Sequence, residues 1–203
     1  MIFFLPVLSS HTVLMKSILF TAIIFFGTFS LDFVKKAQKL LIVSGTVTIC
    51  LNWLDHFFPS HVFDLVFSLS FFFYNLFIVV FMVRHIAKSE KVNVSIIINS
   101  ISGYLLIGIL GSVLLNISEI LHEHIYHLDK RAINFAGGAA QGFHDFLYFG
   151  FITLTTLGYG DVTPVSALAK SLTIFIAVAG QLYMTILIAM LVGKYITSTI
   201  EKP

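Results

Sequence analysis

Residues 153–161 read Thr-Leu-Thr-Thr-Leu-Gly-Tyr-Gly-Asp, and this stretch decides the interpretation of the chain. Its glycines alternate with larger residues, and glycine adopts positive φ without the steric cost of a Cβ atom. A backbone that alternates in this way can point successive carbonyl groups at one axis, where they replace the water shell of a potassium ion. The pattern predicts a filter segment whose ion-binding residues are Thr156, Leu157, Gly158, Tyr159 and Gly160.

Gly-Tyr-Gly-Asp alone is also compatible with a surface turn, because Gly and Asp are common turn residues. Three neighbouring features favour the filter: the threonine-rich run before it, a short apolar helical stretch before that, and a membrane-length apolar segment on each side. One chain supplies only a quarter of a carbonyl ring. The pattern therefore predicts a homotetramer, or a pseudo-tetramer with related subunits.

The composition is that of an integral membrane protein. Apolar residues make up 58% of the 203 residues and charged residues 11%, whereas roughly 25% is charged in soluble domains. Since a membrane helix takes about 20 residues, five or six crossings fill the chain and leave no room for a soluble catalytic domain. The lipid bilayer is the expected partner, and the net charge of +2 gives no indication of nucleic acid. The single cysteine, Cys50, is expected to be a small buried hydrophobe.

The apolar segments predict five membrane helices, at 12–30, 39–54, 62–83, 94–118 and 166–193. Residues 1–30 leave alternatives open: one long tilted helix, an interfacial segment followed by a helix, or an extra crossing broken near Pro6. A cleaved signal peptide is disfavoured because no basic region precedes the apolar stretch. We therefore divide the chain into N-terminal membrane helices at 1–93 and a pore domain at 94–203.

Basic residues at the ends of the apolar segments predict the orientation. The loops that contain residues 35–39 and 84–91 are basic and are separated by two crossings. Residues 55–61, which lie between those two crossings, carry no Lys or Arg. Because cytoplasmic loops are enriched in Lys and Arg, the basic loops are placed in the cytoplasm and residues 119–131 outside. The cytoplasmic residues are Lys35, Lys36, Lys39, Arg84, Lys88, Lys91, Lys194 and Lys202; Lys130 and Arg131 are external exceptions.

A helix over residues 143–155 is too short to cross the bilayer and is predicted to re-enter it, fed by the loop 137–142. The partial negative charge at the C-terminus of this pore helix favours a cation that has lost its water.

Residues 94–197 resemble the two-helix pore module of the potassium channel superfamily, with the match densest in residues 148–161. The chain looks most like small bacterial ion-channel proteins, which implies a multi-pass protein of the bacterial inner membrane. The resemblance implies an all-α fold of outer helix, pore helix, filter and inner helix, preceded here by three or four further helices. It also implies passive conduction of K⁺ by a tetramer, with K⁺ in the filter and no other cofactor. Leu157 stands where Val is commoner in the family.

The resemblance also assigns supporting residues around the filter. Tyr148 and Phe149 correspond to an aromatic pair that packs around the filter tyrosine in the family, although generic core packing is the alternative. Asp161 follows the filter, and its usual acidic partner on the pore helix is replaced by Ile152. Tyr148 is therefore the expected hydrogen-bond donor to Asp161, and Thr155 is the remaining support residue.

Two further features concern gating. Gly180 lies where the family has a hinge glycine, and close helix packing is the equal alternative. None of the first three spans carries an arginine ladder, so we expect weak voltage dependence.

An external metal site could be formed by His122, Glu123, His124 and His127. Their spacing matches no established zinc signature. The alternative is a polar or pH-responsive surface patch. The absence of a His-Glu-x-x-His motif argues against a membrane metallohydrolase. A non-selective cation channel and a subunit of a potassium-uptake system are the functions that compete with a potassium channel.

Overall fold

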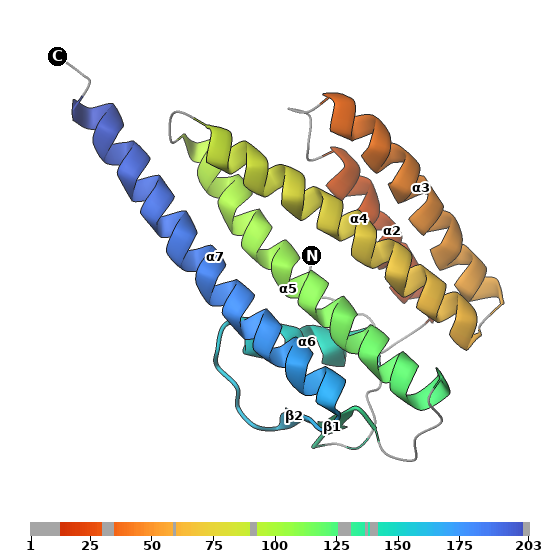
Figure 1. Cartoon of the computed structure of the whole chain (residues 1–203). Coiled ribbons are helices and arrows are strands. Elements are labelled where there is room, and N and C mark those ends of the chain that lie inside the picture. Colours follow the sequence, from red (N-terminus) through yellow and green to blue (C-terminus); the bar gives the residue numbers. More distant parts are fainter. Residues whose placement is uncertain are drawn as a thin grey trace.

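The computed structural model describes residues 13–29, 35–58, 60–89, 93–125, 131–136, 138 and 142–200. The described elements are long helices, a short helix and two short strands (Figure 1). Their bounds, in chain order, are α2 Val13–Phe29, α3 Lys35–Phe57, α4 His61–Lys88, α5 Val94–Ile120, η2 Leu121–Ile125, β1 Ile133–Phe135, α6 Phe143–Leu154, β2 Val162–Pro164 and α7 Ala167–Ile200.

Four of the described helical segments are long and apolar enough to cross a membrane: Gln38–Phe57, His61–Lys88, Val94–Glu123 and Ala167–Lys194. Two of these helices begin at a side-chain cap, where Ser60 accepts a hydrogen bond from the Phe63 amide and Asn93 accepts one from the Ile96 amide. A helix, α2, is present at the expected fifth crossing at 12–30, but its 17 residues are fewer than in the four spanning helices, so a fifth crossing stays a prediction.

The N-terminal helices are joined by buried polar contacts. The Tyr74 hydroxyl on α4 donates to the Ile24 carbonyl on α2 at 2.6 Å and lies 3.0 Å from the Thr28 hydroxyl. Asn52 on α3 donates to the Ser17 carbonyl on α2 at 3.0 Å. Because no water satisfies backbone groups inside a bilayer, such contacts hold helices that apolar burial alone would not orient.

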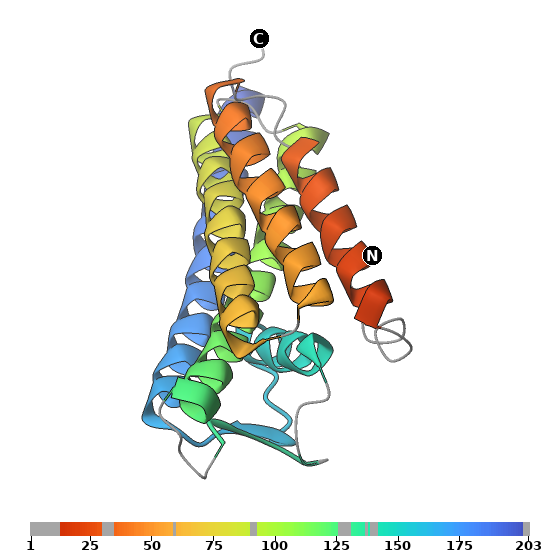
Figure 2. The ribbon, with the colours of Figure 1, turned by 90° about the vertical axis from the view of Figure 1, so that its right-hand side faces the viewer.

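In the C-terminal part of the chain, the short helix α6 packs against α5 and α7. Figure 1 shows α5 and α7 running side by side, and Figure 2 shows α6, β1 and β2 at one end of the helical bundle. β1 pairs with β2 in antiparallel register, with Asn134 opposite Thr163. This two-stranded ribbon is an addition to the expected all-α fold.

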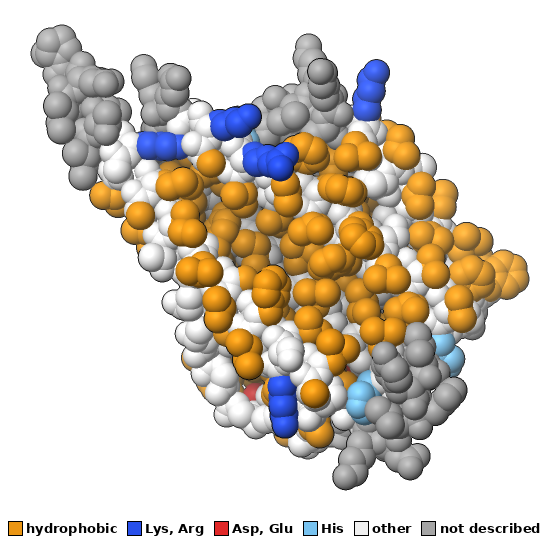
Figure 3. Space-filling view, in the orientation of Figure 1, with side chains coloured by type: hydrophobic (Ala, Val, Ile, Leu, Met, Phe, Trp, Pro, Cys, Tyr) orange, Lys and Arg blue, Asp and Glu red, His pale blue; other side chains and the backbone are white. Residues whose placement is uncertain are grey.

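Basic side chains gather mainly at one end of the molecule, with one more visible at the opposite end (Figure 3). Figure 3 shows Lys and Arg side chains at the end of the molecule where α4 ends, with hydrophobic side chains over the middle. At this end the Lys194 ammonium on α7 donates to the Ile86 and Ala87 carbonyls of α4, at 2.9 and 3.1 Å. Cys50 is exposed on α3, so the expectation that it is buried was wrong. Its helix packs only partly against the rest of the chain.

Candidate functional site

The predicted pore helix is α6, Phe143–Leu154, one residue shorter than expected. Twelve residues span about 18 Å, which is well short of a bilayer core of about 30 Å. Small residues bring α6 against α5: a Cβ atom on Gly150 would overlap the Ser112 side chain, and one on Gly108 would overlap the Phe151 ring. Close packing therefore fixes the pore helix against the outer helix α5.

The backbone after α6 alternates in handedness as the sequence predicts. Gly158 has φ +49° and Gly160 has φ +84°, while Leu157 and Tyr159 between them do not have positive φ. Thr156 extends the alternation with φ +60°, and among the described residues it is the only one other than glycine with positive φ. Positive φ costs a residue with a Cβ atom about 1–2 kcal/mol. The local fold maintains a strained conformation at Thr156, the first residue of the predicted filter.

The inner end of the predicted filter, residues 156–160, is held by the last turn of α6. The Ile152 carbonyl accepts hydrogen bonds from the Leu157 amide at 2.9 Å and from the Gly158 amide at 3.2 Å. Thr155 closes the helix, and its hydroxyl donates to the Phe151 carbonyl at 2.7 Å. The Ile152 side chain is buried. Ile152 thus acts on the filter through its backbone, a role that its side chain does not indicate.

The outer end of the predicted filter is held by Asp161. The Tyr148 hydroxyl donates to Asp161 Oδ2 at 2.6 Å, so the expected hydrogen bond is confirmed. This bond raises the pKa of Tyr148 to about 12, because the carboxylate acceptor favours the protonated phenol. The Asp161 carbonyl also accepts a hydrogen bond from the Ala136 amide at 3.0 Å. Asp161 therefore connects the filter to the pore helix and to the external ribbon.

Glu119 anchors this ribbon to the outer helix, a contact that the sequence did not predict. Its Oε2 accepts a hydrogen bond from the Ile133 amide of β1 at 3.0 Å, and the residue is only 9% exposed. β1 in turn pairs with β2, which begins one residue after Asp161. The only signal in the sequence is a carboxylate at the end of an apolar helix, and this pattern predicts no more than that Glu119 belongs to the external segment.

Two filter side chains are uncovered in a single chain. Leu157 is 54% exposed and Tyr159 is 68% exposed. Phe149, by contrast, is buried in a cluster that includes Leu115 and Ile133. A contact between Phe149 and a filter tyrosine therefore stays a prediction.

Gly180 lies at the junction of α7 with the end of the pore helix. A Cβ atom there would lie 2.5 Å from the Leu154 carbonyl oxygen and 2.8 Å from Leu154 Cδ1. Contacts this short require the backbone to move, so Gly180 has the packing role. Its role as a hinge stays a prediction.

The predicted external metal site is only partly described. His122 and Glu123 lie in the π-helical turn η2, whereas the His124 side chain and the whole of His127 lie outside the described residues. The described side chains contain no group of three or more His, Cys, Asp or Glu residues that could hold a metal ion. The four-residue site stays a prediction.

Comparison with known proteins finds ion channels. A family model described as "Ion channel" matches residues 101–197. The chain is 45% identical over 64 residues to "Potassium channel K1" of Plasmodium berghei (strain Anka), and 44% identical over 45 residues to "Two-pore potassium channel 2" of Arabidopsis thaliana. These matches cover 29% and 22% of this chain, but only 3% and 10% of the two relatives. No solved structure matches the chain.

Proposed function

We propose that the chain conducts K⁺ selectively and passively as a homotetramer. Through residues 101–197 it belongs to the potassium channel superfamily, whose members are ion channels and not enzymes. It is a multi-pass membrane protein. The proposed location is a bacterial inner membrane, with the basic helix ends in the cytoplasm and the filter near the outer face. The proposed ligand is K⁺, bound in the filter.

The observation that carries the proposal is the alternating backbone of residues 156–160. Positive φ at Thr156, Gly158 and Gly160 supports carbonyl groups that point in one direction, as a dehydrated cation requires. The C-terminus of α6 lies directly before this segment, and its partial negative charge favours a cation. Two independent features thus stabilise the same positive charge.

The exposed surfaces support a tetramer. Leu157 and Tyr159 present large side chains beside the filter that the chain itself does not cover. Much of α7 is also uncovered, including Phe175, Val178 and Leu182. In a four-fold assembly, neighbouring subunits would cover the filter side chains and α7 would line the inner pore.

Flux measurements on purified protein in liposomes test the proposal. Under equal gradients, K⁺ flux should greatly exceed Na⁺ flux, and the protein should have the native mass of a tetramer. Equal fluxes would favour a non-selective cation channel, and a monomeric or dimeric mass would contradict the assembly. A subunit of an uptake system would show little flux without its partner proteins.

A matched pair of variants separates the filter from general backbone strain. Gly158→Ala places a Cβ atom at φ +49° inside the filter, whereas Gly138→Ala places one at φ +103° outside it. Neither Cβ atom would meet another atom within 4 Å in this chain. Gly158→Ala should abolish K⁺ flux with the tetramer intact, and Gly138→Ala should retain flux. Similar flux from both variants would argue against the assignment of the filter.

A further inference from the structure

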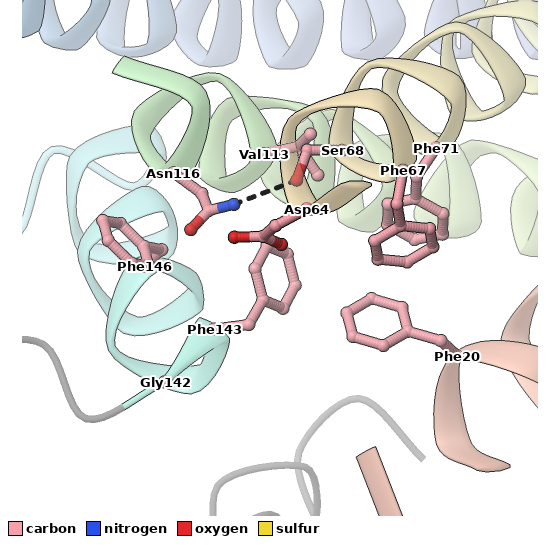
Figure 4. A pocket seen from close by; sticks show the side chains of 10 residues that line it. All are labelled: Phe20, Asp64, Phe67, Ser68, Phe71, Val113, Asn116, Gly142, Phe143 and Phe146. Carbon is pink, nitrogen blue, oxygen red and sulfur yellow. Dashed lines mark hydrogen bonds between the residues drawn. The ribbon is translucent and has the colours of Figure 1, made fainter. Parts of the chain in front are cut away.

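A cavity of about 170 Å³ lies away from the filter, among α2, α4, α5 and the start of α6 (Figure 4). An engineered protein cavity of about 150 Å³ holds benzene, so the space is sufficient for a small organic molecule. Ten residues line it: Phe20, Asp64, Phe67, Ser68, Phe71, Val113, Asn116, Gly142, Phe143 and Phe146. The lining contains one acidic side chain and no Lys, Arg or His.

Asp64 gives the cavity its charge. The residue is half-buried in the first turn of α4, and its carboxylate makes no hydrogen bond or ion pair with any part of the chain that the structure describes. Asp64 lies near the beginning of α6, whose N-cap residue is Gly142, but no hydrogen bond joins its carboxylate to the described amides of that helix. A carboxylate that is partly removed from water and unpaired favours a bound cation.

The neighbouring polar groups add acceptors. Asn116 on α5 donates through its amide nitrogen to Ser68 Oγ on α4 at 3.2 Å. This bond fixes the amide and leaves its oxygen as an acceptor. Figure 4 shows the Asp64 carboxylate beside Asn116 and the Phe143 ring. The polar wall is therefore built to accept hydrogen bonds from a donor or to face a positive charge.

Phenyl rings form most of the remaining wall. The Phe20 ring centroid lies 5.3 Å from that of Phe67 and 5.2 Å from that of Phe143, so rings from three helices meet here. Aromatic faces attract weakly hydrated cations such as alkylammonium groups. A calcium ion, by contrast, takes six to eight oxygen ligands, and the lining provides three oxygen-bearing side chains. The lining favours an organic cation over a metal ion.

We propose that this cavity binds a small organic ammonium cation, whose charge is balanced by Asp64 and whose alkyl groups contact the phenyl rings. The site is independent of the filter, but Gly142 and Phe143 belong to the beginning of the pore helix. An occupant would touch α2, α4 and α5 as well as α6, and so would connect the N-terminal helices to the helix that supports the filter.

Calorimetric titration of the full-length protein in detergent, at constant potassium chloride, tests the proposal. The probes are choline and its uncharged isostere 3,3-dimethylbutan-1-ol. Choline should bind once per chain, and the isostere should bind at least about tenfold more weakly. Asp64→Asn should weaken choline binding by about tenfold or more. Phe143→Leu, which keeps every charge, should weaken it by about two- to fivefold.

The matched control is Asp55→Asn, which removes a carboxylate at the end of α3 that does not line the cavity. This variant should bind choline like the wild type. Equal binding of choline and the isostere would overturn the proposal. Unchanged choline binding in Asp64→Asn and Phe143→Leu, with both variants eluting at the native size, would also overturn it, because choline would then bind elsewhere, for example in the pore. Absence of choline binding to the wild type would overturn the proposal as well. Failure of the proposed channel function is a separate result, because it would appear as an absence of K⁺ flux in the liposome measurement.

Discussion

The Tyr148 hydroxyl lies 2.6 Å from Asp161 Oδ2, and this hydrogen bond joins the pore helix to the residue that follows the filter. The sequence departs from its family at Ile152, where an acidic partner for Asp161 is usual. Tyr148 thus supplies the contact that a second carboxylate would otherwise provide. The outer end of the filter is held by a neutral donor.

Tyr148→Phe tests this contact. Removal of the donor leaves the Asp161 carboxylate without its side-chain partner, so the outer filter should lose its conducting shape more readily. Currents during long openings at low external K⁺ should decline faster than in the wild type. Tyr104→Phe, which removes a hydroxyl from α5, is the control and should behave like the wild type. Identical declines in Tyr148→Phe and the wild type would show that the bond does not support the filter.

Alkaline pH should remove the same contribution. The pKa of Tyr148 is raised from 10.0 to about 12 in the folded protein, so its hydrogen bond contributes fully below pH 10 and is lost as the pH rises through about 12. The difference in thermal midpoint between the wild type and Tyr148→Phe should therefore be constant up to pH 10 and shrink above it. A difference that stays constant to pH 12 would contradict this assignment.

Ile152→Glu restores the acidic position that the family usually has. The Ile152 side chain is only 6% exposed, so the introduced carboxylate would be forced to seek a polar partner near the outer filter. We expect slow inactivation during sustained opening, which the wild type should largely lack. The control is Ile152→Leu, which conserves volume and should change little. A wild-type current that collapses at low external K⁺, with Ile152→Glu behaving alike, would count against the argument.

Gly180→Ala distinguishes packing from hinge motion. Its Cβ atom would collide with the Leu154 carbonyl, so the free energy of unfolding should fall by about 1–3 kcal/mol and K⁺ preference over Na⁺ should weaken. Gly193→Ala is the control, because its Cβ atom would meet nothing within 4 Å in this chain. The free energy of unfolding of Gly193→Ala should equal that of the wild type or exceed it by up to about 1 kcal/mol. If Gly180→Ala lowers only the open probability, the residue acts as a hinge.

Lys194→Met tests the contact between the inner helix and α4. The ammonium donates to two carbonyls at the C-terminus of α4, where a positive charge also interacts favourably with the helix dipole. Its loss should free the end of α7 and raise the open probability about two- to fivefold, which corresponds to about 0.4–1 kcal/mol. Single-channel recording measures this effect, with Lys170→Met at the other end of α7 as the control. An equal rise in both variants would indicate a general effect of charge.

The sequence determined the features that depend on local chemistry and on the membrane. Apolar stretches of sufficient length must form helices in a bilayer, because no other open structure satisfies their backbone groups. The helical segments were therefore predicted to within a few residues at most ends, except where α4 and α7 extend five and seven residues further. The filter was predicted because Gly158 and Gly160 allow a backbone that other residues rarely adopt.

Tertiary structure alone decided the contacts that support the filter. No local pattern shows that Glu119 reaches the Ile133 amide 14 residues later, or that residues 133–135 pair with residues 162–164. The close approach of Gly180 to Leu154 likewise depends on how two helices cross. The cavity beside Asp64 forms only where four helices from both halves of the chain meet. Such contacts are set by the packing of segments far apart in sequence, whereas helix formation and positive φ are set within a few residues.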